Sequence, residues 1–193
     1  MDPRVHEHAE ILVDWSARVA AGDTVVLSVA EGAHDLAVAV AEALGERGAN
    51  LVATYDSDEL TRAYLRGHDS EFDADPAHEL ALVENADVYL RLGGGRNTTA
   101  TADVASETRQ AYRRSRTGIR EARMDTDWVS TVHPTRSLAQ QAGMAYEEYQ
   151  DFVYDAILRD WESLGAEMAQ LKTILDAGSE VHIEKAETDL WLS

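Results

Sequence analysis

The hydrophobic positions along the chain follow two periods, which predict strands and helices in alternation. Strand-like apolar runs bounded by turn residues occupy residues 24–30, 50–56, 88–92 and 127–135. Helical spacing is found at residues 3–20, 34–49, 58–66, 77–85 and 101–115. This order predicts an α/β fold: a mostly parallel open sheet flanked by helices, which begins with a right-handed βαβ unit. We expect the first strand to be buried on both faces, and the third strand also to be a buried strand.

Residues that favour the ends of helices flank several of these stretches. The predicted starts are Asp2 with Pro3, Asp35 and Thr101, and the predicted ends are Gly22, Gly48 and Gly143.

The pattern changes after Pro134, where helical spacing dominates. A short helix is predicted at 135–142, and a long helical run at 146–176 with a break near Gly165. One face of this run carries Tyr146, Tyr149, Val153, Ala156, Ile157 and Trp161. We expect this face to be core, and we expect Phe152 and Tyr154, which lie off it, to contact a neighbouring domain or subunit.

Residues 178–193 alternate twice between apolar and polar side chains, which predicts two short strands in a hairpin. A lone hairpin is marginally stable in water, so we interpret it as the start of a second, β-rich domain. The predicted organisation is an α/β domain at 1–177, then a hairpin at 178–193 that begins a second domain, most of which lies beyond these residues.

The composition excludes several classes of protein. The chain has 36 acidic and 17 basic residues, only two of them lysines, and a net charge of −19. Such a surface repels phosphate backbones, so nucleic acid is not an expected partner. Because the acids are dispersed, adaptation to the high salt of a halophilic archaeon is favoured over an acidic site for basic partners. There is no signal peptide or membrane span, which predicts a soluble, cytoplasmic protein without membrane partners.

No stretch of the sequence carries a recognisable active site. The absence of cysteine excludes disulfides and thiolate chemistry. The loop at 92–100, LGGGRNTTA, lacks the spacing of a phosphate-binding motif and is interpreted as a flexible loop, as is VAEGAH at 29–34. Glu147 and Glu148 point to different helix faces and do not form an acid and base pair. For each of the seven histidines, surface or capping roles are favoured over metal ligation: His6, His8, His34, His68, His78, His133 and His182.

Several short motifs resemble one known family, the thermophilic-type metallo-aminopeptidases, which include aminopeptidase T, aminopeptidase S and their relatives. The matching pieces are W....HPT at 128–135, AQQAGM at 139–144, EEYQDFVYDA at 147–156, Asp160 with Trp161, GSEVHI at 178–183 and TDLWL at 188–192. The opening ILVDWS...AAGDTVVLSV at 11–29 is also similar to the family's first helix and strand. Ala145 departs from the pattern, because relatives often have serine there.

The resemblance implies the N-terminal domain of a homodimeric enzyme about twice this length, which removes N-terminal residues from peptides. It implies two divalent metal ions, zinc, cobalt or similar, whose ligands follow the segment equivalent to TDLWL. No residue of this chain is therefore predicted to be catalytic or a metal ligand, and the chain alone is predicted to bind no metal and to be inactive. The alternatives are a stand-alone acidic α/β binding or interaction module and, with less support, a nucleotide-binding domain that uses the loop at 92–100.

Overall fold

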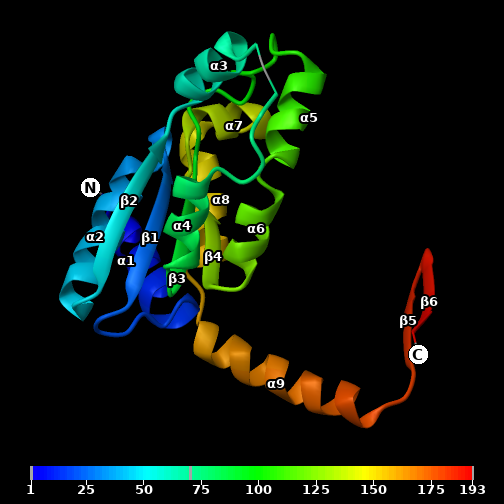
Figure 1. Ribbon diagram of the computed structural model, residues 1–193. Helices are drawn as coiled ribbons and strands as arrows, with labels where there is room; N and C mark the ends of the chain where they lie inside the picture. Colours follow the sequence, from blue (N-terminus) through cyan, green and yellow to red (C-terminus); the bar gives the residue numbers. More distant parts are fainter. Residues whose placement is uncertain (1, 70, 193) are drawn as a thin grey trace. The chain divides into compact units, whose positions relative to one another are not determined.

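The computed structural model describes residues 2–69 and 71–192, which fall into two compact units, one up to Leu158 and one from Arg159 onward. The first unit contains a four-stranded sheet in the order β2-β1-β3-β4 (Figure 1). The strands are β1 (Thr24–Ala30), β2 (Asn50–Asp56), β3 (Val88–Gly93) and β4 (Asp127–Val132), and all neighbours are parallel. The predicted α/β fold and the parallel pairing of the first two strands are confirmed.

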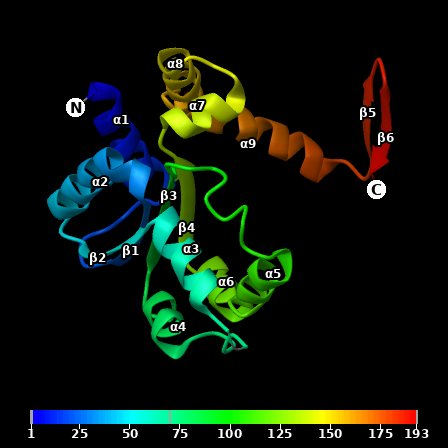
Figure 2. The same ribbon diagram turned by 90° about the horizontal axis from the view of Figure 1, so that it is seen from above.

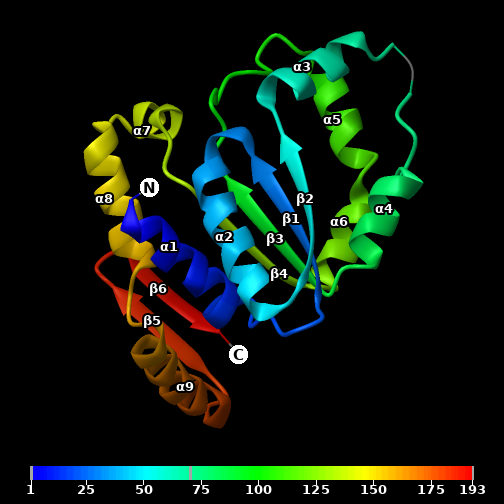
Figure 3. The same cartoon turned by 90° about the vertical axis from the view of Figure 1, so that its left-hand side faces the viewer.

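Helices cover both faces of this sheet, with α1 and α2 on one face and α4 and α6 on the other (Figures 2 and 3). The helices of the first unit are α1 (Pro3–Glu10), α2 (His34–Arg47), α3 (Asp58–Gly67), α4 (Ala77–Glu84), α5 (Ser106–Arg114), α6 (Thr117–Met124), α7 (Arg136–Ala142) and α8 (Tyr146–Ile157). A π-helix (Ile11–Ser16) continues α1, and a short 3-10 turn (Glu31–Ala33) leads into α2.

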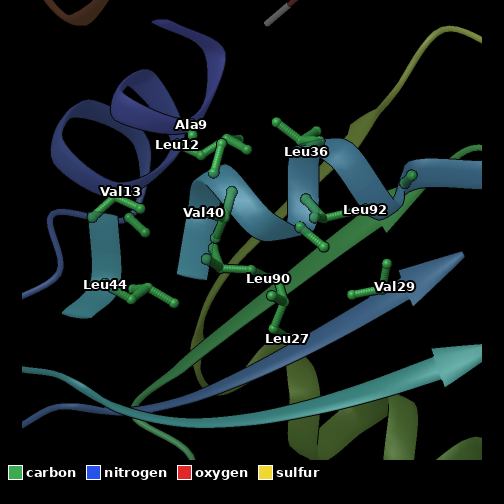
Figure 4. Packing of buried hydrophobic residues seen from close by; sticks show 14 of the residues in the cluster. Ala9, Leu12, Val13, Leu27, Val29, Leu36, Val40, Leu44, Leu90 and Leu92 are labelled. Carbon is green, nitrogen blue, oxygen red and sulfur yellow. The ribbon is translucent and has the colours of Figure 1, made fainter. Parts of the chain in front are cut away.

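The main core lies between the sheet and the helices α1 and α2 (Figure 4). Leu36, Val40 and Leu44 of α2 are fully buried above Leu27 of β1 and Leu90 of β3. The spacing of these α2 residues matches one helix face, which is why the apolar pattern predicted both elements correctly. Burial of such side chains contributes roughly 1.5–3 kcal/mol each to stability.

β1 is buried on both faces as predicted, but β3 is not. Val88, Leu90 and Leu92 are buried in the main core, whereas Tyr89 is half-buried and Arg91 is exposed on the opposite face. The predicted burial of β3 therefore holds for one face only, since its sequence, VYLRLG, alternates between apolar and polar side chains. The second face of the sheet is therefore partly polar at its centre.

Three predicted helix boundaries were wrong, the end of the first helix and the starts of α2 and α5. The first helix ends at Ser16 rather than near residue 20, because Arg18 has a left-handed backbone (φ 51°). Asp35 lies inside α2, since the preceding 3-10 turn places Ala33 at the N-cap. Thr101 belongs to a series of turns, and α5 begins five residues later, at Ser106. In contrast, Asp2, Gly48 and Gly143 cap their helices as predicted.

The helix α6 was not predicted, and its start depends on a distant residue. The backbone amides of Gly118 and Ile119 donate hydrogen bonds of 2.8 and 3.2 Å to the Asp75 carboxylate, which lies more than 40 residues earlier in the chain. An anionic acceptor at a helix N-terminus satisfies free amides and complements the helix dipole. No local sequence pattern reports such a cap.

The long helical run divides at residues 158–160, not near Gly165. α8 ends at Ile157, and Asp160 caps the next helix, α9 (Trp161–Ala177), by accepting a 2.9 Å hydrogen bond from the Ser163 amide. Gly165 lies inside α9. The buried face of α8 also differs from the prediction, because Tyr154 is 1% exposed within the core of its own unit. Phe152, by contrast, is 62% exposed.

The second unit consists of α9 and a two-stranded antiparallel sheet, which confirms the predicted hairpin. Its strands are β5 (Val181–Lys185) and β6 (Thr188–Leu192). None of the described residues of this unit is fully buried, and its exposed large apolar side chains are Met168, Leu171, Ile174, Leu175, Ile183, Leu190, Trp191 and Leu192. Each of the two elements thus carries uncovered apolar side chains.

Candidate functional site

The carboxyl ends of β1, β3 and β4 meet at a crevice, the place where open α/β sheets bind ligands. Three segments surround it, at 31–35, 94–96 and 133–137, together with Tyr146 at the start of α8. The cavity has a volume of about 440 Å³, and its ionisable lining side chains include Glu31, Asp35, Arg96 and His133.

The two glycine-containing loops of the crevice pack directly against each other. A Cβ atom on Gly32 would lie 2.1 Å from the carbonyl oxygen of Gly94 and 2.9 Å from the Thr135 methyl group. Only glycine fits there without displacing backbone. The glycine in VAEGAH therefore serves close packing of the loops rather than the approach of a ligand.

The loop at 92–100 already has an anionic partner within the chain. The backbone amides of Arg96 and Asn97 each donate a 3.1 Å hydrogen bond to Oδ2 of Asp58, the first residue of α3. These are the amides that would otherwise hold a phosphate. An internal carboxylate thus takes the place of an external anion, which argues against nucleotide binding by this loop.

The motif HPT at 133–135 joins the crevice to the sheet. The His133 amide donates a 2.8 Å hydrogen bond to the Gly93 carbonyl, which extends the pairing of β3 with β4. Thr135 caps α7, and its hydroxyl donates to the Gly95 carbonyl at 3.2 Å. Ser137 donates a second, 2.6 Å hydrogen bond to the same carbonyl. The motif therefore fixes backbone at this end of the sheet.

A cluster of buried polar side chains lies beside the crevice, between α1, β4 and α8. His8 is 1% exposed, and its Nε2 lies 2.9 Å from the Thr131 hydroxyl. Its ring meets Tyr154 edge-on at a centroid distance of 6.3 Å, and the Arg4 guanidinium lies 4.6 Å from the Tyr154 ring centre. Among the described residues, His8 Nδ1, His133 Nδ1 and the Tyr154 hydroxyl have no hydrogen-bond partner.

Burial controls the protonation of this cluster. It lowers the pKa of His8 to about 4, with a further contribution from the nearby His133 charge. Burial also lowers the pKa of His133, although Asp35 opposes this shift, and it raises the pKa of Tyr154 to about 12. Both imidazoles and the phenol are therefore neutral at pH 7. The prediction of surface or capping roles was wrong for His8 and His133, which are buried.

The other histidines are dispersed over the fold. His6 and His78 lie on exposed helix faces, His34 starts α2 and contacts the Tyr55 hydroxyl, and His68 ends α3. His182 of the hairpin lies 2.8 Å from Asp189 and stacks on Trp191. Within residues 2–69 and 71–192, no three His, Cys, Asp or Glu side chains converge as a metal site would require. These residues do not fit the two ions implied by the resemblance.

The sequence matches the family described as thermophilic metalloprotease (M29) over residues 1–193. The chain belongs to this family. The motif HPT and the buried Tyr154 both lie in segments that resemble the M29 family in sequence. No curated protein matches the sequence significantly.

A solved structure shows the same fold. AmpT from Thermus thermophilus superimposes with a TM-score of 0.75 at 18% identity, over 98% of this chain and 53% of that protein. The chain thus spans about half the length of AmpT. A cysteine desulfurase from Thermococcus onnurineus NA1 matches with a TM-score of 0.38 at 12% identity, over 70% of this chain and 28% of that protein, and carries no weight. In the described part of the chain, every helix is too short or too polar to span a bilayer.

Proposed function

We propose that this chain is the N-terminal scaffold of a dinuclear metal-dependent aminopeptidase, whose metal ligands and catalytic groups lie outside these 193 residues. Membership of the M29 family over the whole chain is the observation that carries this proposal. The AmpT-like fold over about half of that protein's length supports it. The full enzyme would act on N-terminal residues of peptides with zinc, cobalt or similar ions, and would be a cytoplasmic homodimer.

The described residues support a structural rather than a chemical role. The crevice loops satisfy one another through Gly32, Asp58 and Thr135, and the buried imidazoles lack converging carboxylates. In this proposal, the α/β domain at 1–177 forms one wall of the peptide cavity, and the hairpin at 178–193 leads into the catalytic domain. The exposed apolar side chains of α9, β5 and β6 fit a contact with that domain.

The dispersed acidic surface supports a second part of the proposal, adaptation to high salt. A net charge of −19 on 193 residues creates self-repulsion, which dense salt screens. The same acidic surface also fits the alternative function, a stand-alone acidic binding module that retains the scaffold without catalysis.

One experiment separates these two functions. The coding sequence that follows residue 193 is determined, and the 193-residue chain and any longer protein are purified in high salt. Hydrolysis of leucine p-nitroanilide is measured with added cobalt or zinc, and again after chelation with EDTA. We expect metal-dependent turnover by the longer protein and none by the chain. A stop codon directly after Ser193, or turnover by the chain alone, would contradict the proposal.

A further inference from the structure

A cationic pocket lies on the face of the sheet opposite the main core, which is unexpected in so acidic a chain. Five of the chain's 15 arginines line one cavity of about 470 Å³. They are Arg91 on β3, Arg113 at the end of α5, Arg116 just before α6, and Arg120 and Arg123 on α6; we call this the arginine pocket. Glu79 is its one acidic lining residue among those described.

The local sequence is as unusual as the cavity. Residues 106–124 carry six arginines and two glutamates, within a chain whose acids outnumber its bases by more than two to one. Arg116, Arg120 and Arg123 follow the i, i+4, i+7 spacing, which places them on one face of a helix. Helices α4 and α6, which form two walls of the pocket, lie side by side (Figure 3).

The charges in the pocket are mostly uncompensated. Glu79 accepts a 3.1 Å hydrogen bond from Nε of Arg116 and neutralises it. In the described part of the chain, no ion pair is formed by the other four arginines, Arg91, Arg113, Arg120 and Arg123, although acidic residues outnumber basic ones in the protein. Like charges gathered in one cavity repel one another, so an anion from solution would lower the free energy of this arrangement.

Aromatic rings hold two of the guanidinium groups in place. The Arg116 guanidinium lies 3.7 Å from the Tyr112 ring centre, and that of Arg123 lies 5.8 Å from the rings of both Tyr89 and Trp128. Such stacking fixes the plane of an arginine and leaves its N–H groups free to donate. Nε of Arg123 is buried and has no acceptor among the described residues. A ligand oxygen would satisfy a donor of this kind.

We propose that the arginine pocket binds a small oxyanion that carries two or more negative charges. Guanidinium groups donate paired hydrogen bonds to phosphate and carboxylate oxygens, and several of them around one cavity favour a multivalent ligand over chloride. The N-terminus of α6 is not part of this site, because Asp75 already accepts its amides. This inference does not depend on the peptidase function.

The test is isothermal titration calorimetry with inorganic pyrophosphate and, in a second arm, citrate. The full 193-residue chain is used at the lowest NaCl concentration at which circular dichroism shows it to be folded, because salt screens this interaction. We expect saturable binding at one site per chain. The preferred arm distinguishes a phosphate ligand from a carboxylate ligand.

Three variants make the test specific to the pocket. Arg91→Gln combined with Arg120→Gln, two exposed positions, is expected to weaken binding by about tenfold or more. Arg18→Gln, which changes an exposed arginine outside the pocket, is expected to change it by less than about twofold. Glu79→Gln removes the one competing acid and is expected to tighten binding, so the proposal stays testable if the double variant does not fold. Absence of saturable binding by the wild type, or equal weakening by Arg18→Gln, would overturn the proposal.

Discussion

Replacement of the buried His8 by glutamine should make the protein less sensitive to acid. His8 is fully enclosed, and burial lowers its pKa from 6.5 to about 4. Between these values the unfolded chain binds a proton that the folded protein does not, so stability falls as the pH falls through this window. Above pH 6.5 the imidazole is neutral in both states and has no such effect.

The size of this effect follows from the shift in pKa. The fall in the His8 pKa from 6.5 to about 4 corresponds to a maximum of about 3 kcal/mol in the free energy of unfolding. Roughly 2 kcal/mol of this stability is lost between pH 7.5 and pH 5. Glutamine at position 8 removes the titrating group and offers an amide in place of the His8 Nε2 atom, which lies 2.9 Å from the Thr131 hydroxyl. The 36 acidic residues titrate in both proteins, so the difference between them isolates His8.

The assay is urea unfolding at pH 7.5 and pH 5, followed by far-ultraviolet circular dichroism at constant salt. The wild type should lose about 2 kcal/mol more than His8→Gln between the two pH values. His6→Gln, which removes an exposed histidine from the same helix, should follow the wild type. Equal pH dependence of the wild type and His8→Gln would show that His8 is not held neutral by burial.

Three further predictions concern the crevice and the surface. Gly32→Ala should destabilise the protein by about 2 kcal/mol or more, whereas Gly45→Ala, at an open position inside α2, should stabilise it by about 0.5–1 kcal/mol. Thermal unfolding measures both changes. An unchanged stability of Gly32→Ala would contradict the close packing of the loops. Asp58→Asn should cost about 1 kcal/mol and speed amide hydrogen exchange at Arg96 and Asn97; unchanged exchange would mean that the carboxylate does not hold this loop. The melting temperature should rise between about 0.1 and 2 M NaCl, and a flat or falling curve would count against adaptation to salt.

The strands were predictable because their signal is local. TVVLSVA and ADVYLRLG contain enough apolar side chains in sequence to indicate a strand wherever the chain places them. The exposure of Arg91 follows from the alternation in VYLRLG, whereas the cationic pocket on that face of β3 depends on arginines that come from α6 and the end of α5. Periodicity therefore gave the position of the strand and not the environment of both its faces.

Features that depend on distant partners were not predictable in this way. α6 is capped by Asp75, and the break before α9 depends on Asp160 acting as an N-cap, whereas Gly165 is tolerated inside the helix. The environment of His8 depends on Thr131, which lies 123 residues later in the chain. The local sequence around a histidine on an amphipathic helix does not show whether a distant residue will bury it and form a hydrogen bond with it.

The central claim, that these residues build a parallel-sheet scaffold but hold no metal by themselves, is tested most directly by the metal content of the folded chain. The purified chain is incubated with zinc or cobalt, dialysed, and analysed by inductively coupled plasma mass spectrometry, with circular dichroism as the control for folding. We expect no stoichiometric retention of either metal. One tightly retained ion per chain, ligated in a crystal structure wholly by side chains from these residues, would contradict the claim.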